Sequence, residues 1–146
     1  MFGIGKLFKK KKAAMEVQLH KVENRDLMEA IVAGAVLVAH ADGDCSDEEL
    51  AVLHNIIEAN DNLKHFGSEI GVTIDKYCDM YKAGARLAKV KLLKEIRDVA
   101  ADETQKIEAF IIAIEIADAD GTIDDSELAM LKTIGKELGL NPDNYI

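Results

Sequence analysis

The sequence predicts an all-α protein, a compact single-domain bundle of about six to seven helices. Apolar residues recur at intervals of three and four along the chain, and no stretch alternates apolar and polar residues as a half-buried strand would. Proline occurs once, at Pro142, so long uninterrupted helices are possible. Residues 39–56 and 117–134 are identical at ten of eighteen positions. This repeat predicts two similar helix-turn-helix halves.

The first half contains a helix from Asp26 to the turn at Asp42-Gly43, where Gly43 suits the left-handed conformation that ends many helices. Ser46, with Glu49 three residues later, forms a candidate capping box that begins the next helix. Asn60-Asp61-Asn62 marks the end of that helix. The apolar stripes of the two helices consist of Leu27, Ile31, Ala35 and Val38, and of Leu50, Leu53, Ile56 and Ile57.

Further helices are predicted over 69–82 and 86–99, separated by Gly84. Asp102 should cap the most apolar helix, which extends to Ala117 and should therefore be central, packed on more than one side. After the second turn, Asp124 and Glu127 repeat the capping arrangement. The last helix should stop at Gly139, shortly before the proline.

The charge is unevenly distributed. Residues 1–12 carry five lysines and no acidic residue, so the net charge of −9 becomes −14 once those lysines are set aside. An acidic body argues against nucleic-acid binding, which needs a basic face. The sequence contains no run of 18 apolar residues, so no transmembrane helix is predicted. Two cysteines without a signal peptide indicate a cytoplasmic protein.

Residues 1–12 are interpreted as a basic, apolar tail, separate from a helical domain over 13–146. The tail is either a solvated chain end or a weak anchor at the surface of the inner membrane. In the second case each lysine near anionic headgroups contributes about 1 kcal/mol. The candidate contact residues are Phe2, Lys6, Lys9, Lys10, Lys11 and Lys12.

The two turns resemble shortened calcium-binding loops, because oxygen-bearing residues alternate around an Asp-Gly pair and end at a glutamate. The candidate ligands are Asp118, Asp120, Asp124 and Glu127 in the second turn, and Asp42, Asp44 and Glu49 in the first. Ile116 and Val38 occupy the first loop position and cannot be ligands. We therefore expect weak binding with several retained waters. Hard oxygen ligands favour Ca²⁺, with Mg²⁺ as the alternative.

Helix capping alone is a competing interpretation, because an Asp-Gly helix end followed by a capping box requires no metal. Capping does not explain Asp42 and Asp120, which lie near a helix C-terminus, where the helix dipole disfavours an acid. This excess of carboxylates favours cation binding, with the second turn the stronger site.

Other chemistries lack the required spacing. Histidines and cysteines form no paired metal-binding motif, and no nucleophilic triad or phosphate-binding glycine loop is present. We therefore expect no enzyme activity. A metal-dependent hydrolase is the remaining enzymatic alternative, although nothing in the sequence positions a substrate.

The doubled Ala-Asp-Gly turns and the ending Leu138-Gly139-Leu140-Asn141-Pro142 resemble TerB-like proteins of the tellurite-resistance systems, over most of residues 26–146. The resemblance implies two pseudo-repeated helical halves in a cytosolic protein of bacteria or phages. It also implies divalent-cation binding beside a membrane-embedded, TerC-like partner. Carried over by position, the implied sites are Asp42, Asp44 and Glu49, and Asp118, Asp120 and Glu127. This chain departs at His40, which stands where the second turn has Asp118.

The leading hypothesis is a non-enzymatic, divalent-cation-binding adaptor of a tellurite-resistance or stress-response system, acting at the inner membrane with a membrane partner. The alternative is a metal-free helical interaction module whose acidic turns are only helix caps.

Overall fold

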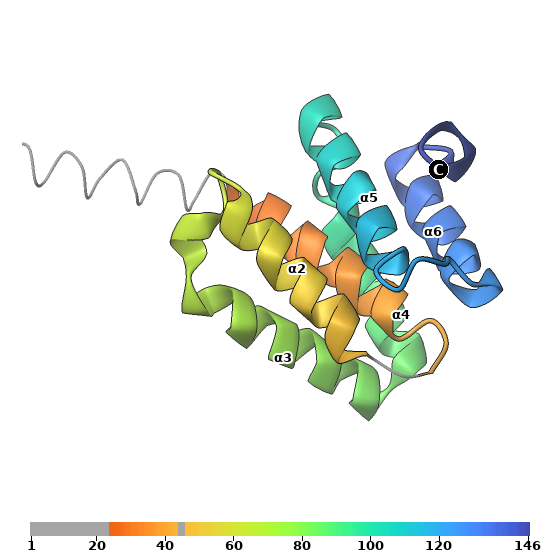
Figure 1. The fold of residues 1–146 in the computed structure, drawn as a ribbon, viewed down its shortest axis with the longest axis horizontal. Helices are drawn as coiled ribbons and strands as arrows, with labels where there is room; N and C mark the ends of the chain where they lie inside the picture. The colour runs from red at the N-terminus through yellow and green to blue at the C-terminus, as the bar shows by residue number, and fades with distance from the viewer. Residues whose placement is uncertain (1–23, 44–45) are drawn as a thin grey trace, which may run out of the picture.

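The computed structural model describes residues 24–43 and 46–146, and Figure 1 shows their arrangement. Six α-helices and two short 3-10 helices lie within these ranges, with no strand, which confirms the predicted all-α class. A helix covering residues 24–39 comes first. It is followed by α2 (Asp47–Ala59), η1 (Lys64–Phe66), α3 (Ser68–Ala83), α4 (Ala85–Arg97), α5 (Glu103–Ala117), α6 (Asp125–Leu138) and η2 (Pro142–Asn144).

The predicted punctuation of the helices is confirmed where the structure describes it. Gly43 and Gly121 have φ angles of 97° and 91°, and Gly139 ends α6 at φ 72°. These values lie in the region that favours glycine. The side chains of Ser46, Asp102 and Asp124 accept hydrogen bonds at the starts of α2, α5 and α6. The sequence did not predict η1.

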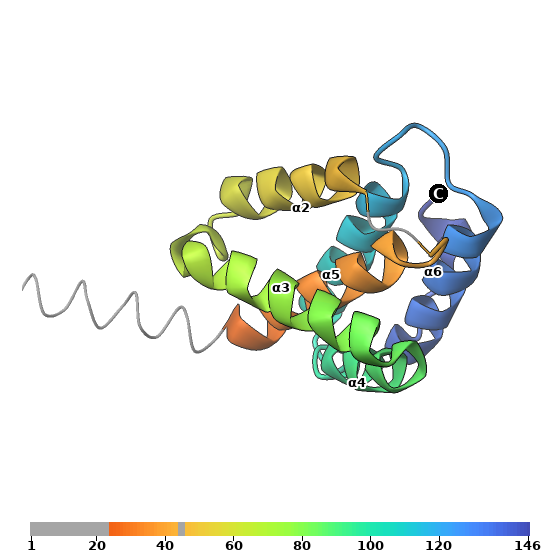
Figure 2. The same ribbon diagram turned by 90° about the horizontal axis from the view of Figure 1, so that it is seen from below.

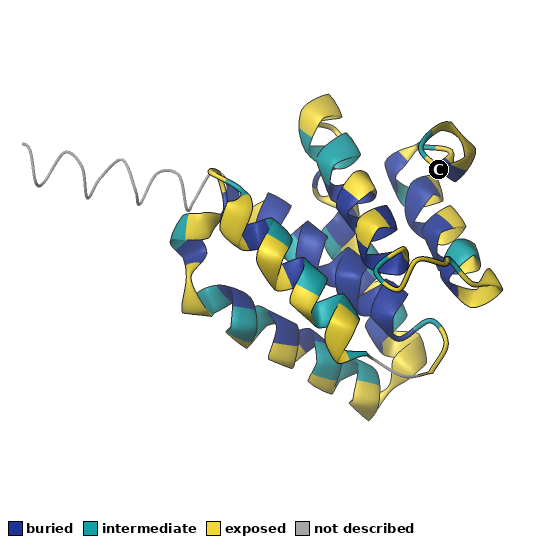
Figure 3. Ribbon diagram, in the orientation of Figure 1, coloured by how far each residue is buried: buried dark blue, intermediate teal, exposed yellow. Residues whose placement is uncertain are grey.

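The helix over residues 24–39 forms the centre of the core. Every residue from Ile31 to His40 is buried, whereas α5, which we expected to be central, exposes Ile111 and Glu115. α5 does pack on two sides, against α2 and α6. A Cβ at Gly34 would lie 3.7 Å from Ala113 Cβ, so the small residue allows the first helix to approach α5 closely. Figure 3 shows the buried residues concentrated along these two helices.

The outer helices cover this pair from opposite sides. α2 contacts α5, whereas α4 contacts α3 and α6. Figure 2 shows α2 along one side of the molecule and the α3–α4 hairpin along the other. Both acidic turns lie at the same end of the bundle, near the start of α2 and the start of α6 (Figures 1 and 2).

Within the described ranges, no helix combines the length and the apolar composition that crossing a bilayer requires. The proposed membrane-contact residues of the tail, Phe2 to Lys12, lie outside those ranges.

Candidate functional site

The two acidic turns repeat one another in their backbone hydrogen bonds. The amide of Gly43 donates to the carbonyl of His40 at 3.0 Å, and the amide of Gly121 donates to the carbonyl of Asp118 at 2.9 Å. Two residues before each glycine the pattern is also the same: the amide of Ala41 donates to the carbonyl of Val38, and the amide of Ala119 donates to the carbonyl of Ile116. The repeat in the sequence is therefore a repeat in the structure, including the positive φ at each glycine.

The helices that follow both turns begin with a side-chain cap. At α6 the cap is reciprocal: Asp124 Oδ1 accepts from the amide of Glu127 at 2.7 Å, and Glu127 Oε1 accepts from the amide of Asp124 at 3.2 Å. At α2, Ser46 Oγ accepts from the amide of Glu49 and donates to Glu49 Oε1 at 2.9 Å. Capping is thus a real function of these residues.

The aspartates of the second turn are exposed. Asp118 is the C-cap residue of α5. Asp120 Oδ1 accepts from the amide of Thr122 at 3.1 Å, a local turn bond that the sequence analysis did not foresee. Asp120 therefore stabilises the turn locally, and its presence near the helix C-terminus does not by itself require a cation.

The first turn differs at its start. His40 is only 7% exposed, its Nδ1 donates to the carbonyl of Val36 at 2.8 Å, and its ring stacks on Tyr81 with 4.5 Å between centroids. His40 therefore faces the core, and this turn has no counterpart of the exposed Asp118 carboxylate. Asp42 is exposed, and Asp44 lies outside the described residues.

The carboxylates of the two turns lie close enough to affect each other's ionisation. Burial, followed by the nearby carboxylates of Asp42, Asp120 and Asp124, raises the pKa of Glu49, against the lowering effect of its bond to Ser46. Burial and the carboxylates of Asp124 and Glu49 raise the pKa of Glu127 to about 7. Each turn ends in a glutamate, Glu49 in the first and Glu127 in the second, which we call the closing glutamates. Carboxylates of each turn thus raise the pKa of the closing glutamate of the other. Positions 49 and 127 are both helix N3 residues, so the duplication identifies them as equivalent, but only the packing of the two halves brings them together.

Glu127 is 5% exposed, and Glu49 Oε2 is buried without a hydrogen-bond partner. Such a buried oxygen is costly unless a donor or a cation satisfies it. The described residues nevertheless contain no group of three His, Cys, Asp or Glu side chains placed to hold a metal ion. The structure brings the closing glutamates of the two turns near each other, but it leaves Asp118 and Asp120 outside any preformed set of ligands.

A second group of carboxylates was not predicted. Burial, followed by Glu29 and then Asp98 and Asp26, raises the pKa of Glu95, and the side chains of Glu95 and Glu29 are hydrogen-bonded. Burial and the same group raise the pKa of the Tyr77 hydroxyl. Because this group joins the first helix to α4, only the tertiary packing could reveal it.

Comparison with known proteins gives a family for most of the chain and a partial relative. The family model described as tellurite resistance protein TerB matches residues 28–146. The soluble NSF attachment protein homolog FPV011 of Fowlpox virus (strain NVSL) is 41% identical over 64 residues. That alignment covers 44% of this chain and 22% of the viral protein, so this chain spans only a minor part of that relative's length. No solved structure matches this chain.

Proposed function

Because the chain belongs to the TerB family of tellurite resistance proteins, we propose that it is a non-enzymatic adaptor that binds a divalent cation at its paired acidic turns. The observation that carries the proposal is the mutual effect of the turns: the carboxylates of each raise the pKa of the glutamate that closes the other. Burial and other carboxylates raise both pKa values, hydrogen bonds from Ser46 and the Asp124 backbone oppose the rise, and no lysine or arginine of the described residues contributes. A divalent cation would supply the missing positive charge.

The residues present suit a hard cation. In the second turn Asp118, Asp120, Asp124 and Glu127 would supply oxygens, and in the first turn Asp42, Asp44 and Glu49 would do so. Asp118 and Asp120 are exposed and can change rotamer without disturbing the core, whereas Asp124 is exposed but also caps α6 through Oδ1. All-oxygen ligands favour Ca²⁺, with Mg²⁺ as the alternative. A bound cation would compensate the negative charges of Glu49 and Glu127. It would thereby reduce their repulsion and strengthen the contact between the two halves.

Calorimetric titration with Ca²⁺ and with Mg²⁺ at pH 7.5 tests this proposal. We expect saturable heat and a rise in Tm for the wild type, and loss of both for Asp120→Asn combined with Glu127→Gln. The amide oxygens of these substitutions can still accept the turn and cap hydrogen bonds, so the fold should survive. Glu58→Gln, an exposed change on α2 outside the turns, is the matched control. Absence of heat and of a Tm shift in the wild type at millimolar cation contradicts the proposal.

The alternative is a metal-free helical interaction module, supported by the cap hydrogen bonds at both turns. The viral relative is named an attachment protein homolog, which fits an interaction role as well. The two functions differ in one measurement, because a metal-free module should bind its partner equally well with and without chelator.

The tail and the membrane partner complete the proposal. Residues 1–12 would hold this cytoplasmic adaptor at the inner membrane surface, beside a TerC-like membrane protein. Flotation with anionic liposomes, using the whole chain and a chain lacking residues 1–12, tests the tail. Equal flotation of the two chains rules out the anchor.

A further inference from the structure

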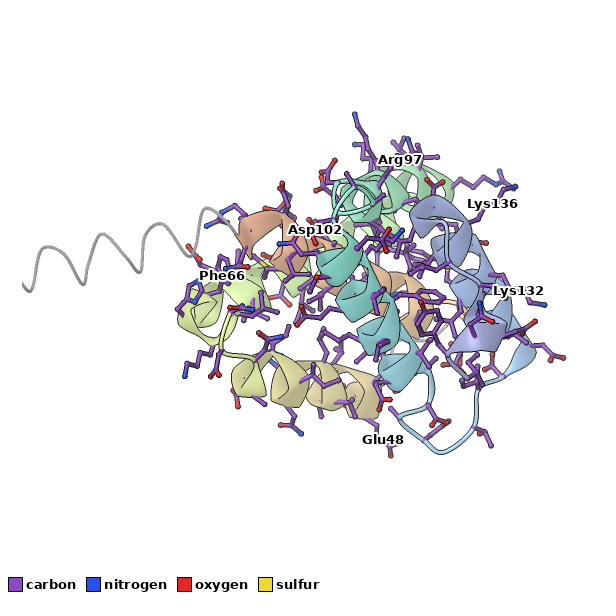
Figure 4. The ribbon with its side chains drawn as sticks, turned by 90° about the horizontal axis from the view of Figure 1, so that it is seen from above. Glu48, Phe66, Arg97, Asp102, Lys132 and Lys136 are labelled. Atoms are coloured by element: carbon purple, nitrogen blue, oxygen red, sulfur yellow. The ribbon has the colours of Figure 1, made fainter. Side chains whose placement is uncertain are left out.

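Helix α4 differs in charge from the rest of the protein. It has five basic residues and one acidic residue, although the chain has a net charge of −9. The first turn of α2, by contrast, contains Asp47, Glu48 and Glu49. Figure 4 shows Arg97 of α4 and Glu48 of α2 at opposite edges of the molecule. Helix α4 is therefore basic, whereas the start of α2 is acidic.

Two large apolar side chains are exposed on α4. Leu87 is 61% exposed and Val90 is 66% exposed. They lie three residues apart and so share the outer face of α4, while Ala88, Leu92 and Ile96 fill its buried face. Exposed Arg86 and Lys94 stand four residues on either side of Val90. Apolar residues grouped within a polar rim are typical of interaction surfaces.

Beside Leu87 the surface is hollowed. A cavity of about 180 Å³ lies at the α3–α4 junction, lined by Met80, Leu87, Ala88 and Lys91 among others. A neighbouring hollow of about 370 Å³ shares Met80 and Lys91 and adds Lys76 and Lys94. The groove therefore combines apolar side chains with three lysines, and Glu95 and Asp98 line the edge of its second hollow.

We propose that this groove is a docking surface for an acidic amphipathic segment of a partner protein. A large apolar side chain of the partner would enter the hollow beside Leu87 and Met80. Carboxylates on either side of it would pair with Lys91 and Lys94, as charge complementarity requires. The surface lies on α3 and α4 and contains none of the candidate cation ligands, although Tyr81, next to Met80, stacks on His40 of the first turn. The docking proposal does not rest on cation binding.

Other occupants fit the surface less well. Residues 1–12 carry five lysines, which α4 would repel. An anionic bilayer presents a continuous negative surface, which would meet Glu95 and Asp98 at the edge of the second hollow. A discrete segment can keep its carboxylates away from these two residues.

The test uses the full chain with EDTA present, so that failure of the cation proposal does not affect the result. The probe is a fluorescein-labelled synthetic helical peptide with leucines on one face and glutamates on the other, and binding is followed by anisotropy. We expect saturable binding that weakens with added salt. Leu87→Ser combined with Val90→Ser should lower the affinity at least about tenfold, and Lys91→Gln combined with Lys94→Gln about fivefold.

The matched control is Lys132→Gln combined with Lys136→Gln, two exposed lysines on α6 (Figure 4). This control should change the affinity less than about twofold, and circular dichroism melts establish that each variant folds. Any of three binding results overturns the proposal: no saturable binding up to about 1 mM peptide, equal affinity of the α4 variants and the control, or α4-dependent binding of phosphatidylglycerol vesicles without binding of the peptide. Self-association that the α4 variants abolish would assign the groove to a second copy and likewise overturn it.

Discussion

The second acidic turn begins with an exposed aspartate, Asp118, whereas the first begins with a buried histidine, His40, that stacks on Tyr81. The backbone hydrogen bonds at these two positions are equivalent. The turn geometry therefore depends on the Ala-Asp-Gly segment and the cap that follows, and it tolerates a carboxylate or an inward-facing ring at its start. The first turn uses that position for packing, and the second leaves it available to solvent or a ligand.

Exchanging these two residues should give the largest effect. His40→Asp places a carboxylate where an imidazole donates to Val36 and contacts Tyr81, so we expect a loss of about 2–4 kcal/mol in the free energy of unfolding. Asp118→His, at an exposed position, should change it by less than about 0.5 kcal/mol. Urea denaturation of both variants measures the difference. Similar stabilities for the two would show that His40 does not serve the core.

The closing glutamates make the stability of the protein depend on pH. The pKa of Glu127 is raised from 4.5 to about 7, so the folded state holds its proton more tightly than the unfolded state does. Stability is therefore greatest below about pH 4.5 for this group and falls as the pH rises through 7, by roughly 2–3 kcal/mol. Glu49 acts in the same direction, because its pKa is also raised.

Glu127→Gln should flatten this dependence, since the amide can accept the same cap bond without titrating. Thermal melts of wild type and variant between pH 5 and 8.5 measure it, with Glu58→Gln as the control. If Ca²⁺ binds as proposed, it should raise the Tm of the wild type more at pH 8 than at pH 6. An unchanged pH profile in Glu127→Gln would show that another group causes the dependence.

The sequence predicted best those features that are set locally. Gly43, Gly121 and Gly139 adopt the expected positive φ, and the predicted cap at Asp124 is present, because a turn or cap involves only neighbouring residues. The nearly uninterrupted apolar run from Ile31 to Ala39 indicated a helix buried on all sides, but we expected α5 to be the central one.

Features that depend on packing between distant helices were not predicted. The hydrogen bond between Glu29 and Glu95 joins the first helix to α4, and the coupling of Glu49 to Asp120 and Asp124 joins the two halves. No local pattern indicates either contact. The candidate cation ligands were chosen from spacing alone, and their grouping depends on side-chain directions that spacing does not determine.

The smallest expected effect is the difference in stability lost when each of the two N-caps is removed. Asp124→Ala removes a reciprocal box in which both the Asp124 carboxylate and the Glu127 side chain bond a backbone amide, so it should cost about 1–2 kcal/mol. Ser46→Ala removes the acceptor of the Glu49 amide and the hydroxyl that donates to Glu49 Oε1. It should lower the free energy of unfolding by about 0.5–1 kcal/mol. Urea denaturation near pH 4.5, where little of the stability from protonated Glu127 has been lost, separates the caps from the titration. A larger loss for Ser46→Ala would mean that the hydroxyl mainly serves to compensate the buried Glu49 carboxylate, which would make the first turn the more strained of the two.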